Sequence, residues 1–440
     1  MITITYGNSY SKVSGLNAEQ IKALRKVLSY KVDFATARFI PNPANRVKYC
    51  IDLKGNFATG LIDKVVRFLR YAGIVYQVDN KALDRTEPIR LTRAFKPGLH
   101  IKPYKDQLKA VERLLGYYRG VCSMPTGTGK SFVIAMLLVE SGLKTLIVVP
   151  TLELKYQLTE SLQSLISSTE GITVENIDST ALKTAKDYDC LIIDECHRSA
   201  AQTYRNLNKA AWNNIRWRYS FSATPFRNDI EEQLLYEGVA GSVIFELSYK
   251  KATDMGYIVP ADFYYYELPK IVTEGYTYAE VYKDLIVNND YRNALIADLM
   301  TNLYKNDKYC LCLVKEIAHG EILEKLTGIP FANGQDEDSR QWIKTFSSGK
   351  LKCLIGTEGI LGEGVDTKPC EYVIIAGIGK ARSAFMQKVG RALRRYGDKE
   401  SAKVIIFKDK SHKWSLTHFK TQCKIVEVEY NTQPIKLEIE

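Results

Sequence analysis

The stretch Met124-Pro125-Thr126-Gly127-Thr128-Gly129-Lys130-Ser131 decides the fold, because it joins an apolar strand-like run to an apolar helix-like run, Phe132–Val139. Its glycines permit a loop tight enough to aim backbone N–H groups at a phosphate, and the start of the following helix adds positive potential. Lys130 can reach the β- and γ-phosphates of a nucleotide, and the Ser131 hydroxyl can ligate Mg²⁺. Met124 stands where the phosphate-loop pattern has its first glycine, so the pattern fails at that position. We predict that ATP is bound by the loop residues Thr126, Gly127, Thr128, Gly129, Lys130 and Ser131.

Two consecutive carboxylates, Asp194 and Glu195, follow the apolar run Leu191–Ile193. Open α/β sheets bind ligands at the carboxyl ends of their strands, so Asp194 can hold Mg²⁺ while Glu195 orients or deprotonates the attacking water. An isolated Asp-Glu pair would be interpreted as a solvated strand end, but the phosphate loop upstream favours catalysis. His197 follows the pair and is a candidate sensor of the γ-phosphate.

Tyr104 and Gln107 precede the phosphate loop. A glutamine amide offers two donors and an acceptor, which is enough to read the edge of an adenine ring. We therefore take Tyr104 and Gln107 as candidate adenine contacts.

From about residue 93 onward, short apolar runs alternate with helix-like segments, which is typical of parallel sheets in α/β proteins. We expect strands at Thr145–Val149, Cys190–Ile193, Arg218–Phe221, Cys310–Val314, Lys352–Ile355, Tyr372–Ala376 and Val404–Phe407. The aromatic stretch Tyr249–Lys270 is interpreted as an interdomain linker, and Val426–Glu440 as terminal strands or a tail. The fold class is α/β, with two parallel-sheet lobes at 93–267 and 268–440 after a small α+β domain at 1–92.

The small domain is strongly basic. Residues 1–90 hold fifteen Lys or Arg and seven Asp or Glu, a net of +8 within a chain total of +11. Asn17 and Gln20 resemble a capping box, and a second helix is expected at Leu61–Tyr71, between strands at Val47–Leu53 and Ile74–Val78. Lys64, Arg67 and Arg70 form a basic stripe on that helix. The stripe is either a nucleic-acid contact or a solvated basic surface, and charge alone does not separate the two.

Several classes are excluded. The chain has no apolar run of membrane-spanning length, and its N-terminus lacks the pattern of a signal peptide, so a cytoplasmic protein is expected. The nine cysteines lie mostly in apolar runs and are interpreted as reduced core residues. The spacing in Cys310-Leu311-Cys312, with no second pair nearby, does not match a zinc site.

Seven elements, in order, resemble the motifs of superfamily 2 helicases of the DExH type over about residues 93–410. They are Gln107 (Q motif), Thr126–Ser131 (motif I), Val149-Pro150-Thr151 with Leu154 and Gln157 (Ia), Asp194–His197 (II), Ser222-Ala223-Thr224-Pro225 (III), Gly356-Thr357 with Glu363–Asp366 (V) and Gln387–Arg394 (VI).

The resemblance implies two RecA-like lobes that close on ATP and Mg²⁺. Arg391 and Arg394 would neutralise charge at the γ-phosphate, an effect typically worth ~10³–10⁵ in rate, with Arg394 as the main finger. Gln387 would position water or phosphate, and Gly364 and Asp366 would join the nucleotide site. Ser222 and Thr224 would couple ATP to a nucleic-acid track contacted by Pro150, Thr151, Lys155, Gly356 and Thr357.

Within the superfamily, Arg227 after Ser-Ala-Thr-Pro-Phe and the basic first domain resemble the UvsW type of branch-migrating phage helicases. This implies a helicase for forked and junction DNA in replication and recombination, located in the host cytoplasm if phage-encoded. Recombination or replication proteins are implied as partners, no membrane is expected, and a monomer is allowed. An RNA helicase and the motor subunit of a restriction-type nuclease remain open; a binding module without ATPase activity is disfavoured by the intact Lys130, Asp194, Glu195 and Arg394.

Overall fold

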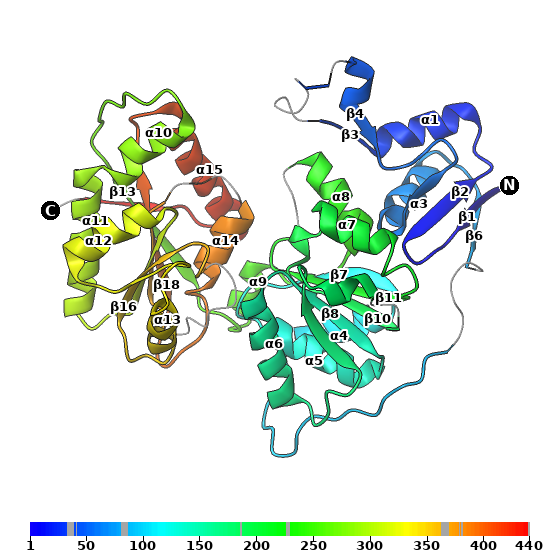
Figure 1. Ribbon diagram of the computed structural model, residues 1–440, viewed down its shortest axis with the longest axis horizontal. Helices are drawn as coiled ribbons and strands as arrows, with labels where there is room; N and C mark the ends of the chain where they lie inside the picture. The colour runs from blue at the N-terminus through cyan, green and yellow to red at the C-terminus, as the bar shows by residue number, and fades with distance from the viewer. Residues whose placement is uncertain are drawn as a thin grey trace. The chain divides into compact units, whose positions relative to one another are not determined.

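The computed structural model describes residues 1–32, 39–40, 42–80, 87–184, 187–225, 229–361, 369–377, 379 and 382–438 (Figure 1). Its internal contacts divide the chain into two units. The first comprises Met1–Met124 and Gly129–Glu246, and the second comprises Pro125–Thr128 and Leu247–Glu440. Among the described residues, no helix has both the length and the apolar character needed to cross a membrane.

The first unit contains a six-stranded parallel sheet in the order β12-β7-β11-β10-β8-β9. Its strands are β7 (Arg119–Ser123), β8 (Thr145–Val149), β9 (Ile172–Asn176), β10 (Cys190–Ile193), β11 (Trp217–Ser222) and β12 (Val243–Glu246). Its helices are α4 (Lys105–Leu115), α5 (Lys130–Ser141), α6 (Leu152–Leu165), α7 (Gln202–Lys209) and α8 (Ile230–Ala240). The expected strands at Thr145–Val149 and Cys190–Ile193 are confirmed, because apolar runs buried on both faces favour parallel strands.

The N-terminal residues of the same unit form a small α+β domain with a four-stranded sheet in the order β5-β2-β1-β6. Its elements are β1 (Ile2–Thr5), β2 (Tyr10–Ser14), α1 (Ala18–Val27), β3 (Ser29–Lys31), β4 (Val47–Tyr49), β5 (Asn56–Ala58), α3 (Ile62–Tyr71) and β6 (Tyr76–Asp79). The capping box of Asn17 and Gln20 is confirmed at the start of α1. The strand expected at Val47–Leu53 ends instead at Tyr49, and the one expected at Ile74–Val78 begins at Tyr76.

The core of this N-terminal domain includes a residue of the neighbouring lobe. Leu234 of α8 packs, 4% exposed, with Leu61, Val65 and Leu69 of the N-terminal domain. On the same helix, Glu237 forms an ion pair of 3.0 Å with Lys64 of α3. The domain and the lobe therefore share one hydrophobic cluster.

Two buried arginines also join the N-terminal domain to the lobe. Arg119 and Arg218 are cross-strand neighbours on β7 and β11. Arg119 donates to the carbonyl oxygens of Val239, at 2.5 Å, and Asn8, while Arg218 donates to Ser9 Oγ at 2.9 Å. Burial lowers the pKa of both guanidinium groups, so the hydrogen bonds to oxygen atoms offset part of the cost of burying two like charges.

The second unit contains a seven-stranded parallel sheet in the order β15-β16-β14-β17-β18-β13-β19. Its strands are β13 (Ala261–Glu267), β14 (Cys310–Val314), β15 (Phe331–Ala332), β16 (Cys353–Thr357), β17 (Tyr372–Ile375), β18 (Ala402–Lys408) and β19 (Ile435–Leu437). Its helices are α9 (Tyr249–Asp254), α10 (Tyr278–Tyr282), α11 (Asp290–Lys305), α12 (Ile317–Thr327), α13 (Ser339–Ser347), α14 (Arg382–Gly390) and α15 (Lys413–Tyr430).

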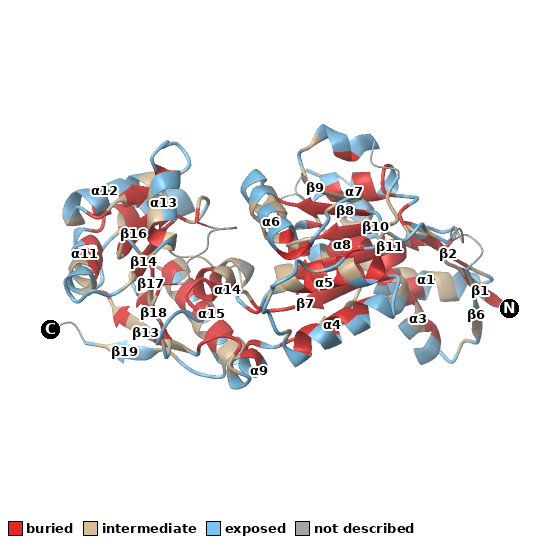
Figure 2. Cartoon of the chain, turned by 90° about the horizontal axis from the view of Figure 1, so that it is seen from below, coloured by how far each residue is buried: buried red, intermediate tan, exposed pale blue. Residues whose placement is uncertain are grey.

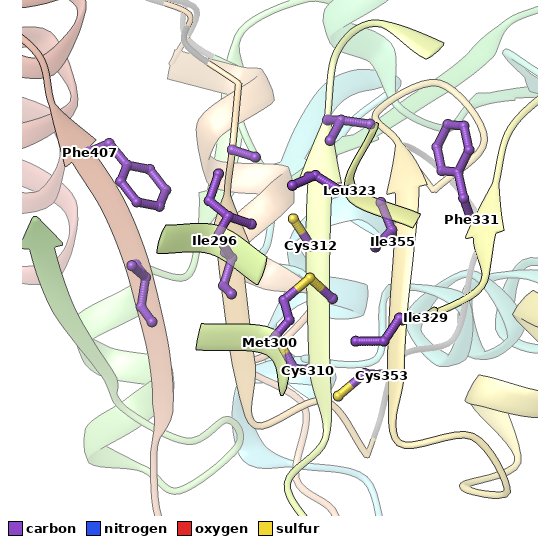
Figure 3. Packing of buried hydrophobic residues seen from close by; sticks show 14 of the residues in the cluster. Ile296, Met300, Cys310, Cys312, Leu323, Ile329, Phe331, Cys353, Ile355 and Phe407 are labelled. Carbon is purple, nitrogen blue, oxygen red and sulfur yellow. The ribbon is translucent and has the colours of Figure 1, made fainter. Parts of the chain in front are cut away.

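Apolar side chains fill the space between this second sheet and its helices. Figure 3 shows Ile296 and Met300 of α11 beside Cys310 and Cys312 of β14, with Phe407 of β18 on the same face. In both units the central parallel strands, among them β8, β10 and β14, are buried, while the outer faces of the helices are exposed (Figure 2). All nine cysteines are free thiols, as expected. The fold is α/β, with two RecA-like lobes and a small N-terminal domain.

One expectation for the second unit is wrong, and a second is wrong for part of its residues. The stretch Tyr249–Lys270 is not a linker, because it contains α9 and β13, and β13 pairs with β18 along seven residues. Residues 247–267 therefore group with the second lobe, and the contacts do not divide the chain at 267/268. Residues 426–430, expected to be strand or tail, belong instead to the end of α15, whereas the strand β19 at Ile435–Leu437 agrees with the expected terminal strands.

Candidate nucleotide and nucleic-acid sites

The phosphate loop has the backbone that its glycines permit. Gly127 and Gly129 have φ of 89° and 82°, in the left-handed region that favours glycine, and Gly129 is the N-cap of α5. Met124, at the unusual position, is fully buried at the end of β7, where its N–H donates to the Ser222 carbonyl at 3.1 Å. Its side chain therefore packs in the core, and the glycines form the part of the loop that would face a phosphate.

Four predicted side chains of the first unit form one continuous chain of contacts. Lys130 Nζ lies 2.6 Å from Glu195 Oε1, and Glu195 Oε2 lies 3.2 Å from His197 Nδ1. The same His197 nitrogen lies 3.2 Å from Ser222 Oγ, which accepts the N–H of Thr224 at 3.1 Å. His197 and Ser222 are 5% and 0% exposed, so these contacts are shielded from water. The phosphate-loop lysine is thus connected to Ser222 and Thr224 through the motif II carboxylate and histidine.

The pKa values of the two motif II carboxyl groups are shifted in opposite directions. Burial, together with the neighbouring charge of Glu195, raises the pKa of Asp194 although Lys130 Nζ is 3.9 Å away. Burial acts in the same sense on Glu195, but Lys130 and His197 outweigh it, and the pKa of Glu195 falls well below its usual range. Glu195 therefore stays ionised and can accept a proton or a hydrogen bond from water. It also has φ of 47°, an uncommon value for a residue other than glycine and one that is often found at functional sites.

Asp194 is suited to a divalent cation. Its buried carboxylate accepts the Glu195 N–H at 2.9 Å, and its raised pKa reflects incomplete compensation of its charge. A cation beside it would favour the ionised form, and carboxylate and hydroxyl oxygens are the ligands that Mg²⁺ prefers. Together with Ser131 at the start of α5, Asp194 fits that group. Among the described residues, no cluster of three His, Cys, Asp or Glu side chains forms a separate metal centre.

The structure places Gln107 against the phosphate loop. Its Oε1 accepts the Tyr104 N–H at 2.9 Å, which closes the first turn of α4. A Cβ on Gly129 would lie 2.5 Å from Gln107 Nε2, so the amide packs directly on the loop. Tyr104 is 39% exposed, and Gln107 is 5% exposed. One face of the amide thus supports the loop in addition to the adenine contact expected from the sequence.

The nucleic-acid candidates of motif Ia already have partners within the protein. Thr151 caps α6, where its Oγ1 accepts the Leu154 N–H at 3.3 Å. Lys155 Nζ is paired with Glu175 Oε2 at 2.9 Å. Pro150 is buried at the end of β8. The sequence carries no signal for the Glu175 partner, because β9 and α6 meet only through the tertiary fold.

In the second unit, Gly356 and Thr357 end β16 and are buried. Gln387 is half-buried on α14, Arg391 is 7% exposed just after that helix, and Arg394 is partly exposed. Lys388, which the sequence did not single out, forms a 2.5 Å ion pair with Glu358. Arg227 and the motif V segment Glu363–Asp366, with Gly364 and Asp366, lie outside the described residues.

The basic stripe of the N-terminal domain lies on α3 as expected, with Val65 and Leu69 fully buried on its other face. Lys64 is neutralised by Glu237, whereas Arg67 is exposed and Arg70 donates to Tyr76 Oη at 3.2 Å. The two arginines therefore carry the exposed charge of the stripe.

Three family descriptions match the chain. The DEAD/DEAH box helicase family matches residues 104–187, the helicase conserved C-terminal domain matches 293–396, and the type III restriction enzyme res subunit matches 172–227. The first two cover the phosphate loop and the arginines of motif VI, respectively.

Two curated relatives are similar over most of their length. The chain is 23% identical to the ATP-dependent DNA helicase UvsW of Enterobacteria phage T4 over 392 residues, which cover 78% of each protein. It is also 23% identical to the DNA 3′–5′ translocase XPB2 of Sulfurisphaera tokodaii, with 70% of this chain and 81% of XPB2 covered.

Solved structures show the same fold at low identity. The ATP-dependent type ISP restriction-modification enzyme LlaBIII bound to DNA has a TM-score of 0.56 at 12% identity, covering 95% of this chain and 39% of that one. Dbp5 of S. cerevisiae, bound to RNA and ADP BeF₃, has a TM-score of 0.54 at 16% identity, covering 76% and 90%. With the helicase families matched in both lobes and the phosphate loop contacting the motif II residues, the chain is an ATP-dependent DNA helicase or translocase of superfamily 2 that resembles UvsW of phage T4.

Proposed function

We propose that this helicase hydrolyses ATP with Mg²⁺ and uses the energy to unwind or branch-migrate forked and junction DNA in replication and recombination. The observation that carries the chemical part is the chain of contacts from Lys130 through Glu195 and His197 to Ser222. These contacts connect Lys130, which would bind the phosphates, to Ser222 at the end of β11, which would respond to their binding.

The residues would divide the chemistry as follows. Lys130 binds the β- and γ-phosphates, and on binding it must exchange its contact with Glu195 for one with phosphate oxygen. Glu195, kept ionised, then orients or deprotonates the attacking water. Ser131 and Asp194 would hold Mg²⁺, which would supply charge neutralisation on the phosphates. Arg391 and Arg394, assigned through their motif, neutralise the charge that grows on the transferred phosphoryl group, and Gln387 positions water or phosphate.

Coupling would run through His197. When Lys130 leaves Glu195, the carboxylate loses its closest cation, and its interaction with His197 Nδ1 changes in strength. His197 also contacts Ser222 Oγ, so the end of β11 and the N–H of Thr224 respond to the occupancy of the phosphate loop. We assign Ser222 and Thr224 this coupling role.

One observation supports DNA as the substrate, and a second supports a DNA with more than one bound arm. The curated relatives named above are named for DNA, as a DNA helicase and a DNA translocase. The N-terminal domain adds a net charge of +8 over residues 1–90 and shares a core with the first lobe through Leu234. A second DNA arm bound by Arg67 and Arg70 would thus be held in a fixed position on that lobe. The name of XPB2 leads us to expect 3′–5′ movement.

A second candidate is the motor of a restriction-type complex, which moves on duplex DNA without separating its strands. The match of residues 172–227 to the res subunit of type III restriction enzymes favours it.

The experiment is steady-state ATP hydrolysis by the purified chain with no nucleic acid, single-stranded DNA, duplex DNA, a DNA fork or junction, and RNA. We expect the greatest stimulation with the fork or junction, accompanied by strand displacement. Stimulation by duplex alone, without displacement, would favour the restriction-type motor, and preference for RNA would overturn the DNA assignment. Lys130→Ala and Glu195→Gln should each abolish turnover while DNA binding remains; turnover retained in both variants would overturn the site.

A further inference from the structure

The second unit contains a cavity of about 480 Å³ that none of the roles proposed above uses. It opens where Lys315 follows β14 and Glu358 follows β16, at the carboxyl ends of two parallel strands. Open α/β sheets bind their ligands at this edge, and the volume is within the roughly 300–1,000 Å³ of ligand pockets. The cavity is therefore placed and sized for a ligand.

One wall of the cavity is aromatic. Tyr278 at the start of α10 lies 5.5 Å, between ring centroids, from Trp414 near the start of α15. Tyr278 also lies 5.9 Å from the ring of His418, one turn further along α15. All three rings line the cavity, and Tyr278 is 36% exposed. The planes of Trp414 and His418 are tilted by 54° and 55° from that of Tyr278, so the wall is aromatic but not flat.

The cavity also carries a cation at its rim. Lys315 is exposed, and its Nζ lies 4.9 Å and 5.5 Å from the ring centroids of Tyr282 and Tyr278. The other lysine of the cavity, Lys388, is neutralised by Glu358 at 2.5 Å. In the part of the chain that the structure describes, Lys315 has cation–π contacts and no ion pair. Its charge can therefore be shared with an anion from outside.

We propose that this cavity binds one unpaired base of a single nucleic-acid strand, stacked on Trp414 with Tyr278 tilted against it, and with the adjoining phosphate at Lys315. Base–aromatic stacking tolerates any base, and a cation beside the ring satisfies the backbone charge. Glu358 and Lys388 offer an acceptor and donors to the edge of the base. The inference rests on the proposed function, because a base reaches the cavity only if the strand runs along the second lobe.

The position of the cavity favours nucleic acid over a free nucleotide. Glu358 directly follows Thr357, which the motif assigns to a backbone phosphate. A strand contacting Thr357 would bring its next nucleotide to the mouth of the cavity. A free nucleoside triphosphate would need several hydrogen-bond donors for its phosphates, whereas, among the described residues, the rim presents Lys315 as its one lysine outside the Glu358–Lys388 ion pair.

Photo-crosslinking with the full-length protein tests the proposal directly. An oligodeoxynucleotide carrying 5-iododeoxyuridine is irradiated with the protein, and the attached peptide is identified by mass spectrometry. We expect attachment within the peptides that contain Tyr278 or Trp414, and loss of this signal on competition with unlabelled oligonucleotide. Attachment confined to peptides elsewhere would overturn the proposal.

Affinity measurements on matched variants provide the second test. Trp414→Ala should weaken single-strand binding about 5- to 150-fold, the equivalent of one lost stack, while Trp414→Phe should restore most of it. Lys315→Gln should reduce the salt dependence of binding by about one phosphate contact. Tyr276→Ala is the control, because Tyr276 is 96% exposed two residues away and does not line the cavity. Thermal unfolding checks that each variant is folded.

The outcomes separate the two proposals. A wild-type protein that neither binds nucleic acid nor is stimulated by it would contradict the proposed function itself. If the wild type binds nucleic acid and its ATPase activity is stimulated, but Trp414→Ala and Tyr276→Ala bind a single strand with equal affinity, only the base pocket would be overturned. Photo-labelling of Trp414 by 8-azidoadenosine triphosphate would also overturn the base pocket if ATP competes with the label and oligonucleotide does not. That result would reassign the cavity to a nucleotide.

Discussion

At the scale of single residues, Ser222 is the point where the proposed nucleotide site contacts the rest of the lobe. Its hydroxyl lies 3.2 Å from His197 Nδ1 and accepts the Thr224 N–H at 3.1 Å. Both Ser222 and Thr224 are almost fully buried, so loss of the hydroxyl leaves a buried N–H without that acceptor. The link depends on one oxygen atom.

We expect Ser222→Ala to uncouple the helicase. ATP turnover should stay within about tenfold, because Lys130 and Glu195 are unchanged, whereas base pairs separated per ATP should fall far more. Parallel ATPase and strand-displacement assays measure the ratio. Ser220→Ala is the matched control, since it removes a buried hydroxyl from the same strand. An equal loss of both activities would contradict the coupling role.

His319 gives the second lobe a predictable response to acid. It is fully buried on α12, its Nε2 lies 2.9 Å from Asn293 Oδ1, and burial together with the charge of Arg292 lowers its pKa from 6.5 to about 3. Below pH 6.5 the unfolded chain binds a proton that the folded chain does not bind. The free energy of unfolding should therefore fall by about 1.4 kcal/mol per pH unit as the pH drops below that value.

Urea unfolding of the wild type and of His319→Gln between pH 7 and pH 5 measures this contribution. The difference between the two proteins should shrink or reverse as the pH falls, because the glutamine cannot take up a proton. A difference that is constant with pH would show that His319 is not held neutral.

The proximity of Lys130, Asp194 and Glu195, which are proposed to form the ATP site, could be predicted from the local sequence. Lys130, Asp194 and Glu195 each follow a buried strand, and parallel strands bring such ends together at one edge. The partners of Lys155 and Lys64 could not be predicted. Glu175 and Glu237 lie on elements that meet only in the folded chain.

At the scale of elements, two segments were misread because local pattern and tertiary packing disagree. The alternation Val426-Glu427-Val428-Glu429-Tyr430 favours a strand, but Phe419, Gln422 and Val426 are buried at helical spacing in α15. The aromatic stretch before Lys270 contains β13, whose pairing with β18 and β19 leaves no signal in its own residues. By contrast, β8, β10 and β14 were predicted to the residue, because uninterrupted apolar runs determine them.

The shared core on α8 should make the N-terminal domain sensitive to a change in the first lobe. Leu234→Ala removes a buried side chain from the cluster that contains Val65 and Leu69, at a cost of about 2–5 kcal/mol. Hydrogen exchange should become faster in α1 and α3, with β8 much less affected. Leu235→Ala, at the half-buried neighbouring position, is the control. Unchanged exchange in α1 and α3 would mean that the domain is stable without this contact.

At the scale of the whole molecule, positive charge is concentrated at one end of the chain, where residues 1–90 carry +8 of the total +11. Truncation is a poor test of its role, because it would expose Leu234 and remove one acceptor from each of Arg119 and Arg218. Substitution of the exposed charges leaves this core in place.

Arg67→Gln with Arg70→Gln should therefore lower the salt dependence of fork binding. Two lost phosphate contacts reduce the slope of log affinity against log salt by about 1.4–1.8. Lys305→Gln with Lys325→Gln removes the same charge from exposed helix ends in the second unit and should leave the slope unchanged. Fluorescence anisotropy at several salt concentrations gives both slopes. Equal slopes for the two double variants would show that the stripe is a solvated surface.

The buried pair Arg119 and Arg218 has a mechanical consequence. The two residues fasten Asn8 and Ser9 to β7 and β11, and those strands continue into the phosphate loop and end at Ser222. If the N-terminal domain holds DNA as proposed, tension applied to that DNA would be transmitted along these two strands to the groups that are proposed to bind the nucleotide. In an optical trap, the stall force and the rate of ATP consumption should then vary together. Replacing either arginine with a residue that cannot make these hydrogen bonds should let the helicase slip along DNA under tension.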